Sequence, residues 1–80
     1  MAEHRKHRRK AVEVAKIIRE SGVDPTAEVV DYAGRWVVDI EGSGVDAPET
    51  VYDLQGEIDR RGLPLWVEAI NSALIAVYDR

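Results

Sequence analysis

Four carboxylates are the residues of this chain whose types and spacing come nearest to a chemical site. Glu28, Asp39, Glu68 and Asp79 occupy alternating positions in strand-like segments, so we expect them on one face of a sheet. Carboxylate oxygens hold Mg²⁺ or Ca²⁺, and a pair of carboxyl groups can supply an acid and a base. We expect Glu28 and Asp39 to face each other across a hairpin, where like charges destabilise a sheet unless a cation intervenes. Because a polar rim around an apolar interface explains all four residues, we predict no metal site and no catalytic residue.

Two further patterns resemble sites but lack the required context. Gly42 and Gly44 follow a strand and precede a helix, as in a dinucleotide-binding loop. That loop needs a parallel β-α-β unit, and the acidic residues around it would repel a pyrophosphate. The two histidines, His4 and His7, lie among cations, with no third metal ligand nearby and no serine partner for catalysis. We therefore expect a non-enzymatic protein without a cofactor.

Charge is distributed unevenly along the chain. The net charge is −4, but residues 1–10 carry five cations against one glutamate, a balance of +4, which leaves −8 for residues 11–80. We predict either a basic N-terminal arm that contacts nucleic acid or an acidic partner, or a frayed, solvated start of the first helix. The cations of this basic segment are Arg5, Lys6, Arg8, Arg9 and Lys10.

An acidic surface offers a second kind of interaction. Glu49, Asp53 and Glu57 recur every four residues in a predicted helix at 46–61 and so share one helix face. Such a face is usually solvated, but it also suits binding to a basic protein. An acidic inhibitor or adaptor that acts on a basic or nucleic-acid-binding protein is therefore an alternative function.

Hydrophobic periodicity and turn residues predict an α+β fold with the order α-β-β-α-β-β. Helices are predicted at 3–21 and 46–61, with Gly22 and Gly62 as their C-terminal caps. Strands are predicted at 27–32, 35–41, 65–70 and 73–79, with tight turns at Ala33-Gly34 and Asn71-Ser72. We expect one four-stranded antiparallel sheet with both helices on one face.

Length and composition favour one small cytoplasmic domain. The chain has 80 residues, of which 45% are hydrophobic and 32% charged, and it has no cysteine. It contains neither a signal-peptide core nor an apolar run of the roughly 18 residues that a membrane helix needs. We predict a single domain at 11–80, in which segments 11–41 and 47–80 form a pseudo-repeat. At a shift of 40 residues the two helix stripes superpose, as do Gly22 and Gly62.

The face of the sheet away from the helices is predicted to be apolar, which is unusual for a face exposed to water. We expect it to bind a second copy of the chain and form a homodimer; another protein, or a stacked base or small ligand, is the alternative occupant. A one-residue error in register would exchange the two faces. The short loops and regular repeat also allow a designed protein without a natural function. The predicted interface residues are Val30, Tyr32, Arg35, Val37, Trp66, Ile70, Ile75 and Val77.

Overall fold

The chain folds into two helices and one four-stranded antiparallel sheet, which confirms the predicted fold class and element order. The computed structural model describes the backbone of residues 2–80 and the side chains of residues 8–80. The strand order in the sheet is β1-β2-β4-β3, so β2 and β4 join the two hairpins at the centre. The elements are α1 (Ala2–Glu20), β1 (Glu28–Tyr32), β2 (Arg35–Asp39), the 3₁₀ turn η1 (Glu41–Ser43), α2 (Ala47–Arg60), β3 (Leu65–Ala69) and β4 (Leu74–Asp79).

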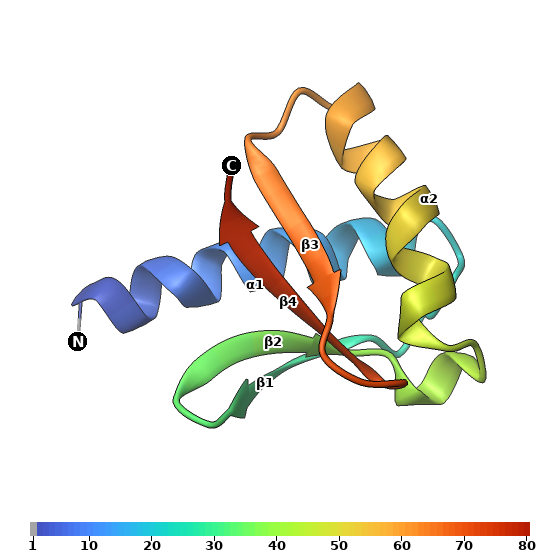
Figure 1. Ribbon diagram of the computed structural model, residues 1–80, viewed down its shortest axis with the longest axis horizontal. Helices are drawn as coiled ribbons and strands as arrows, with labels where there is room; N and C mark the ends of the chain where they lie inside the picture. Colours follow the sequence, from blue (N-terminus) through green and yellow to red (C-terminus); the bar gives the residue numbers. More distant parts are fainter. Residues whose placement is uncertain (1) are drawn as a thin grey trace.

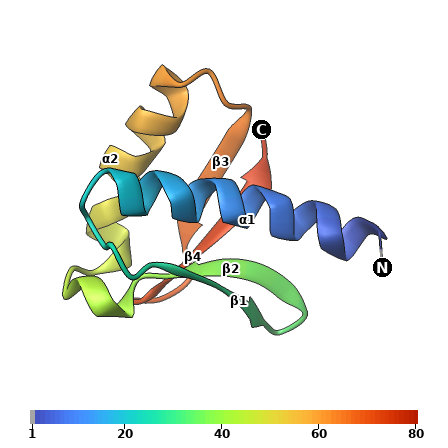
Figure 2. The same cartoon turned by 180° about the vertical axis from the view of Figure 1, so that it is seen from behind.

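Both helices pack on one side of the sheet. Figure 1 shows the strands in front of α1, with α2 beside β3, and Figure 2 shows α1 crossing the sheet from behind. Ile18 of α1 and Ile58 of α2 belong to the same buried cluster as Val38 of β2 and Val67 of β3. This shared core fixes the inner face of the sheet and leaves the other face without a covering layer.

Helix α1 follows its predicted apolar stripe and ends where the glycine predicts. Ala11, Val14 and Ile18 are buried against the sheet, at the three- and four-residue steps of a helix face. Gly22 adopts φ +81°, the left-handed conformation that closes a helix at low steric cost. The predicted basic arm is thus part of a helix that begins at Ala2, not a separate segment.

Helix α2 begins at the predicted place but without the predicted capping box. Asp46 is its N-cap, yet the Asp46 side chain makes no capping hydrogen bond. The Asp46 carbonyl instead accepts hydrogen bonds from the amides of Glu49 at 3.1 Å and Thr50 at 3.2 Å. Pro48 lies in the first turn, where its missing N–H costs nothing. Leu54 and Ile58 are buried as predicted, with Val51 half-buried beside them.

The first hairpin has the predicted register. Tyr32 pairs with Arg35, and Val29 pairs with Val38 on the inner face. The turn residues Ala33 and Gly34 both have positive φ, 53° and 82°, as a tight hairpin turn with primed geometry requires.

The second hairpin differs from the prediction by one residue. A two-residue turn at Asn71-Ser72 would have paired Ile70 with Ala73, but the Ile70 amide donates to the Leu74 carbonyl at 2.9 Å. Asn71 causes this longer turn, because its side-chain oxygen accepts hydrogen bonds from the amides of Ala73 at 2.8 Å and Leu74 at 2.9 Å. Since side chains alternate between faces, the shift reverses every side chain of β4.

The predicted pseudo-repeat therefore holds for the helices and fails for the strands. Gly62 repeats the left-handed conformation of Gly22 with φ +71°. At the shift of 40 residues, however, Val37 lies on the outer face of the sheet whereas Val77 belongs to the core cluster. The two αββ segments share an element order but not a common register.

Gln55 of α2 closes the free edge of the sheet at β3. Its side-chain amide nitrogen donates to the Leu65 carbonyl at 3.0 Å, and its side-chain oxygen accepts from the Val67 amide at 3.0 Å. One side chain thus takes the place of a neighbouring strand and blocks pairing at this edge.

Candidate functional site

The outer face of the sheet consists of three rows of side chains that run across all four strands. The rows follow from the strand register and from the contacts between neighbouring strands. The aromatic row is Tyr32, Arg35, Tyr78 and Trp66; the middle row is Val30, Val37, Ala76 and Glu68; the acidic row is Glu28, Asp39, Leu74 and Ile70. Arginine and aromatic residues thus lie at one end of this face and two carboxylates at the other.

Exposure within this face is concentrated in the aromatic row. Trp66 is 48% exposed and Tyr32 is 43% exposed, while Val37 and Ala76 in the middle row are fully buried by their neighbours. Ile70 is also exposed, and Val30 and Leu74 are half-buried. The face keeps a fully buried apolar centre with large exposed side chains on both sides of it.

Two residues predicted for this face lie on the other side of the sheet. Ile75 and Val77 belong to the core beneath the helices, where Ile75 pairs with Val38 and Val77 with Val67. The prediction was wrong because of the longer turn at Asn71. Leu74, Ala76 and Tyr78 occupy the outer positions of β4 instead, so the face remains apolar.

The carboxylates of the sheet do not converge on one point. Glu28 and Asp39 pair directly across the first hairpin as predicted, and no cation among the described side chains pairs with either of them. Asp79, predicted beside them, lies on the helix side, where it binds Lys10 at 2.5 Å. Among the side chains at 8–80, no group of three histidine or acidic residues could hold a metal ion.

Two of the predicted nucleic-acid contacts are engaged within the fold. The guanidinium carbon of Arg8 lies 5.3 Å from the centre of the Trp36 ring, and Lys10 is held by Asp79 with a mostly buried side chain. Arg9 is exposed on α1. The side chains of Arg5 and Lys6 lie outside the described residues. Figures 1 and 2 show the first turns of α1 extending beyond the strands.

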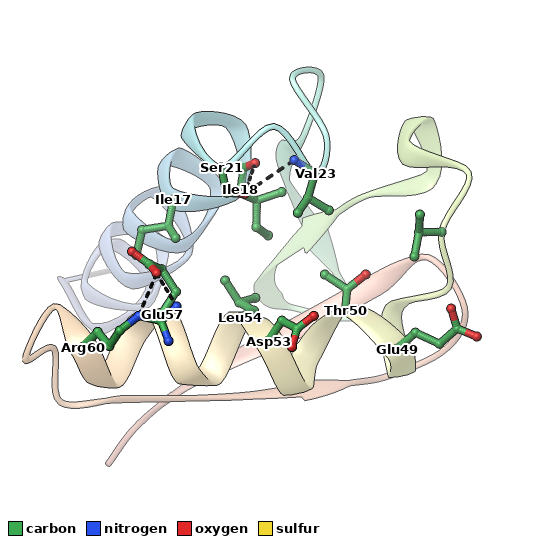
Figure 3. A pocket seen from close by; sticks show the side chains of 11 residues that line it. Ile17, Ile18, Ser21, Val23, Glu49, Thr50, Asp53, Leu54, Glu57 and Arg60 are labelled. Atoms are coloured by element: carbon green, nitrogen blue, oxygen red, sulfur yellow. Dashed lines mark hydrogen bonds and ion pairs between the residues drawn. The ribbon is translucent and has the colours of Figure 1, made fainter.

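A cleft between α1 and α2 brings the predicted acidic residues beside apolar ones. The cleft has a volume of about 470 Å³. Ile17, Ile18 and Leu54 form its buried floor, and Glu49, Asp53 and Glu57 line it from α2. Figure 3 shows Ile18 and Leu54 extending from the two helices toward the space between them, with Asp53 on the α2 side. Val23 and Val45, 40% and 43% exposed, line the cleft from two loops.

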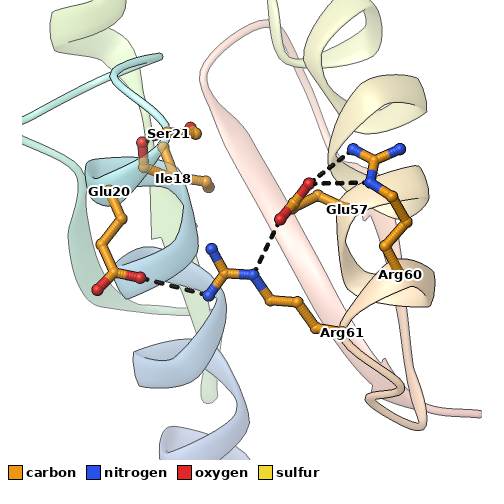
Figure 4. Close-up of polar contacts among 6 residues, drawn as sticks. All are labelled: Ile18, Glu20, Ser21, Glu57, Arg60 and Arg61. Carbon is orange, nitrogen blue, oxygen red and sulfur yellow. Dashed lines mark hydrogen bonds and ion pairs between the residues drawn. The ribbon is translucent and has the colours of Figure 1, made fainter.

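Glu57 differs from the other two acids because arginines neutralise it. Its carboxylate accepts from Arg60 at 2.6 Å and from Arg61 at 3.0 Å, and Arg61 also binds Glu20 of α1 at 3.3 Å (Figure 4). These bonds lower the pKa of Glu57, with Arg60 contributing most, and raise the pKa of Arg61. Glu49 and Asp53 have no hydrogen-bond or ion-pair partner for their carboxylates within the described part of the chain.

One sequence signal for this cleft was available and was missed. The tetrapeptide Ser-Gly-Val-Asp occurs twice, at 21–24 and at 43–46, and its two valines are the exposed apolar residues of the cleft. The predicted repeat was sought at a shift of 40 residues, whereas this pair is separated by 22.

No helix in the described part of the chain is long and apolar enough to cross a membrane. Comparisons of the chain with protein-family models, with curated proteins and with solved structures find no match.

Proposed function

We propose that the protein is a small binding module that forms a homodimer through the outer face of its sheet. The observation that carries this proposal is the distribution of side chains on that face, with an aromatic row at one end, an acidic row at the other and an apolar row between them. Tryptophan, tyrosine and arginine are the residues that contribute most to protein interfaces, and the aromatic row contains all three.

The face is complementary to itself. A twofold axis that runs across the strands along the middle row would place the aromatic row of one copy over the acidic row of the other. In that arrangement Arg35 lies over Asp39 of the second copy, and Trp66 lies over Ile70. Two sheets packed in this way would bury the uncovered apolar face, with their strands within roughly 30° of parallel.

The paired carboxylates give a second reason for this arrangement. Glu28 and Asp39 face each other across the hairpin, which costs stability in a single copy. An arginine from the second copy would supply the cation that these two residues lack within the described chain. The dimer thus offsets an unfavourable interaction and covers an apolar surface with one contact.

A charge placed in the aromatic row tests the proposal. Trp66→Glu is expected to weaken dimerisation by more than about tenfold, because a carboxylate would be buried without a partner. Tyr52→Glu is the matched control, since Tyr52 is an exposed aromatic residue of α2 away from this face. Light scattering over a range of concentrations measures the molar mass. A monomeric wild-type protein at high concentration would contradict the proposal.

Nucleic-acid binding by the first turns of α1 is a second candidate function. The observation in its favour is that this basic helix extends beyond the strands and carries the exposed Arg9 (Figure 1). Arg8 and Lys10 are used within the fold, so the contacts would come from Arg5, Lys6 and Arg9. Each phosphate contact releases about one counterion, which makes such binding steeply dependent on salt.

The matched test changes only charge. We expect Arg5→Gln, Lys6→Gln and Arg9→Gln together to abolish retention of duplex DNA or RNA at low salt. Lys16→Gln, an exposed cation further along α1, serves as the control. Equal retention by the triple variant would exclude this function.

A further inference from the structure

We propose that the cleft between α1 and α2 is a docking site for a cationic amphipathic helix from another protein. The site lies on the helix side of the sheet, away from the dimer face, so the two proposals stand or fall separately. Its apolar floor, its two exposed valines and its unpaired carboxylates each point to one property of the partner.

The two Ser-Gly-Val-Asp loops are built alike. Ser21 donates its hydroxyl to the Ile18 carbonyl at 2.9 Å, and Ser43 donates to the Ile40 carbonyl at 2.8 Å. The same hydroxyl oxygens accept from the amides of Val23 at 3.5 Å and Val45 at 3.0 Å. The intervening glycines, Gly22 and Gly44, have φ of +81° and +72°. Each loop therefore holds its valine in a fixed position at the cleft.

This construction exposes apolar side chains that the monomer does not use. Val23 and Val45 line the same cleft as the buried Ile17, Ile18 and Leu54, so the apolar surface continues from the floor to the outside. A volume of about 470 Å³ is in the range of ligand-binding pockets. An apolar side chain inserted between the valines would remove all of this surface from water.

The charges beside the floor specify a cationic partner. Glu49 and Asp53 lie one turn apart on α2, about 6 Å along the helix axis. Neither carboxylate has a partner in the described chain, whereas Glu57 at the end of the cleft is already neutralised by Arg60 and Arg61. Two lysines or arginines spaced by four residues on a partner helix would match the spacing of Glu49 and Asp53.

An amphipathic helix meets both requirements at once. Its apolar stripe would enter the cleft between α1 and α2, while cations beside the stripe would reach Glu49 and Asp53. The contact is the helix-in-groove type, and the acids select against partners with negative charge.

A model peptide provides the test. The probe is a fluorescent amphipathic peptide of about 14 leucine and lysine residues with leucines at helical spacing, and the same peptide with glutamate for lysine is the negative control. Anisotropy measures affinity, and amide chemical shifts locate the bound peptide. We expect shifts at Ser21–Val23, Val45 and along α2, and no binding of the glutamate peptide.

Matched variants separate this site from general attraction to an acidic protein. Glu49→Gln with Asp53→Asn is expected to weaken binding about tenfold and to reduce its salt dependence, and Val23→Ser with Val45→Ser about fivefold. The controls are Glu13→Gln and Val12→Ser on the exposed side of α1, which should change affinity less than twofold. Equal losses in the control variants, or shifts centred on the sheet, would overturn the proposal.

Discussion

The guanidinium of Arg35 lies over the ring of Tyr78, 4.5 Å from its centre, and donates a hydrogen bond to the Tyr78 hydroxyl at 3.2 Å. This contact joins β2 to β4 across the middle of the outer face. It holds the arginine flat between Tyr32 and Trp66, its neighbours in the aromatic row. A stacked arginine loses little further side-chain entropy on binding, so this row is prepared for contact with a second molecule.

Gln55 is expected to stabilise the fold through the edge of β3. Gln55→Ala removes the partners of the Leu65 carbonyl and the Val67 amide and should lower the free energy of unfolding by about 1–2 kcal/mol. Urea denaturation measures the change. Tyr52→Ala, on an exposed part of the same helix, should have an effect below about 0.5 kcal/mol. Similar stabilities of the two variants would show that the edge contacts contribute nothing.

Gly42 is expected to be required by close packing. A Cβ at this position would lie within van der Waals overlap of the Thr26 hydroxyl, which Asp24 holds by a 2.6 Å hydrogen bond. Gly42→Ala should therefore destabilise the protein by about 1–3 kcal/mol, and Thr26→Ala should recover part of that loss by removing the hydroxyl. Thermal denaturation of the two single variants and the double variant measures the coupling.

Gly56 provides the opposite expectation for a glycine. It lies inside α2, and the nearest atom to an added Cβ is Nη1 of Arg60 at 3.7 Å. Gly56→Ala should stabilise the protein by up to about 1 kcal/mol, because alanine favours the helix. A destabilised Gly56→Ala would mean that an uncrowded helix glycine has a packing role, contrary to the measured space around it.

The salt bridges of Glu57 predict a loss of stability in acid. Because Arg60 and then Arg61 lower the pKa of Glu57 below its usual 4.5, the contribution is complete above the unfolded pKa and disappears as the pH falls through the folded one. Glu57→Gln should therefore be less stable than the wild type at pH 7, and the difference should close below pH 4.5. Unfolding free energies measured across pH test this. A difference that persists unchanged in acid would contradict it.

The fold was predictable from sequence because each element carries its own local signal. The buried stripe of α1, Gly22 and Gly62 at the helix ends, and Ala33-Gly34 in the first hairpin act within a few residues. The register of β4 depended on the Asn71 side chain, which competes with the backbone for the Ala73 and Leu74 amides. Alternating apolar residues on both faces of β4 gave no signal against the wrong register.

The candidate surfaces were predictable in part for the same reasons. Tyr32, Arg35 and Trp66 follow from the register of β1, β2 and β3, whereas Leu74, Ala76 and Tyr78 were missed with β4. The acidic stripe of α2 was visible as helical spacing. Its position beside Ile17 and Ile18 depends on how the two helices pack, which no local pattern specifies.

Sedimentation of charge-exchanged variants tests the dimer most directly. Arg35→Glu should shift the protein toward monomer, because the substituted side chain would meet Asp39 of the second copy. Adding Asp39→Arg should restore the dimer by reversing both partners, an exchange that general loss of apolar contact cannot produce. Dimer lost in the single variant and recovered in the double variant is the predicted result. A wild-type protein that sediments as a monomer, or a double variant no more associated than the single one, would contradict the proposed interface.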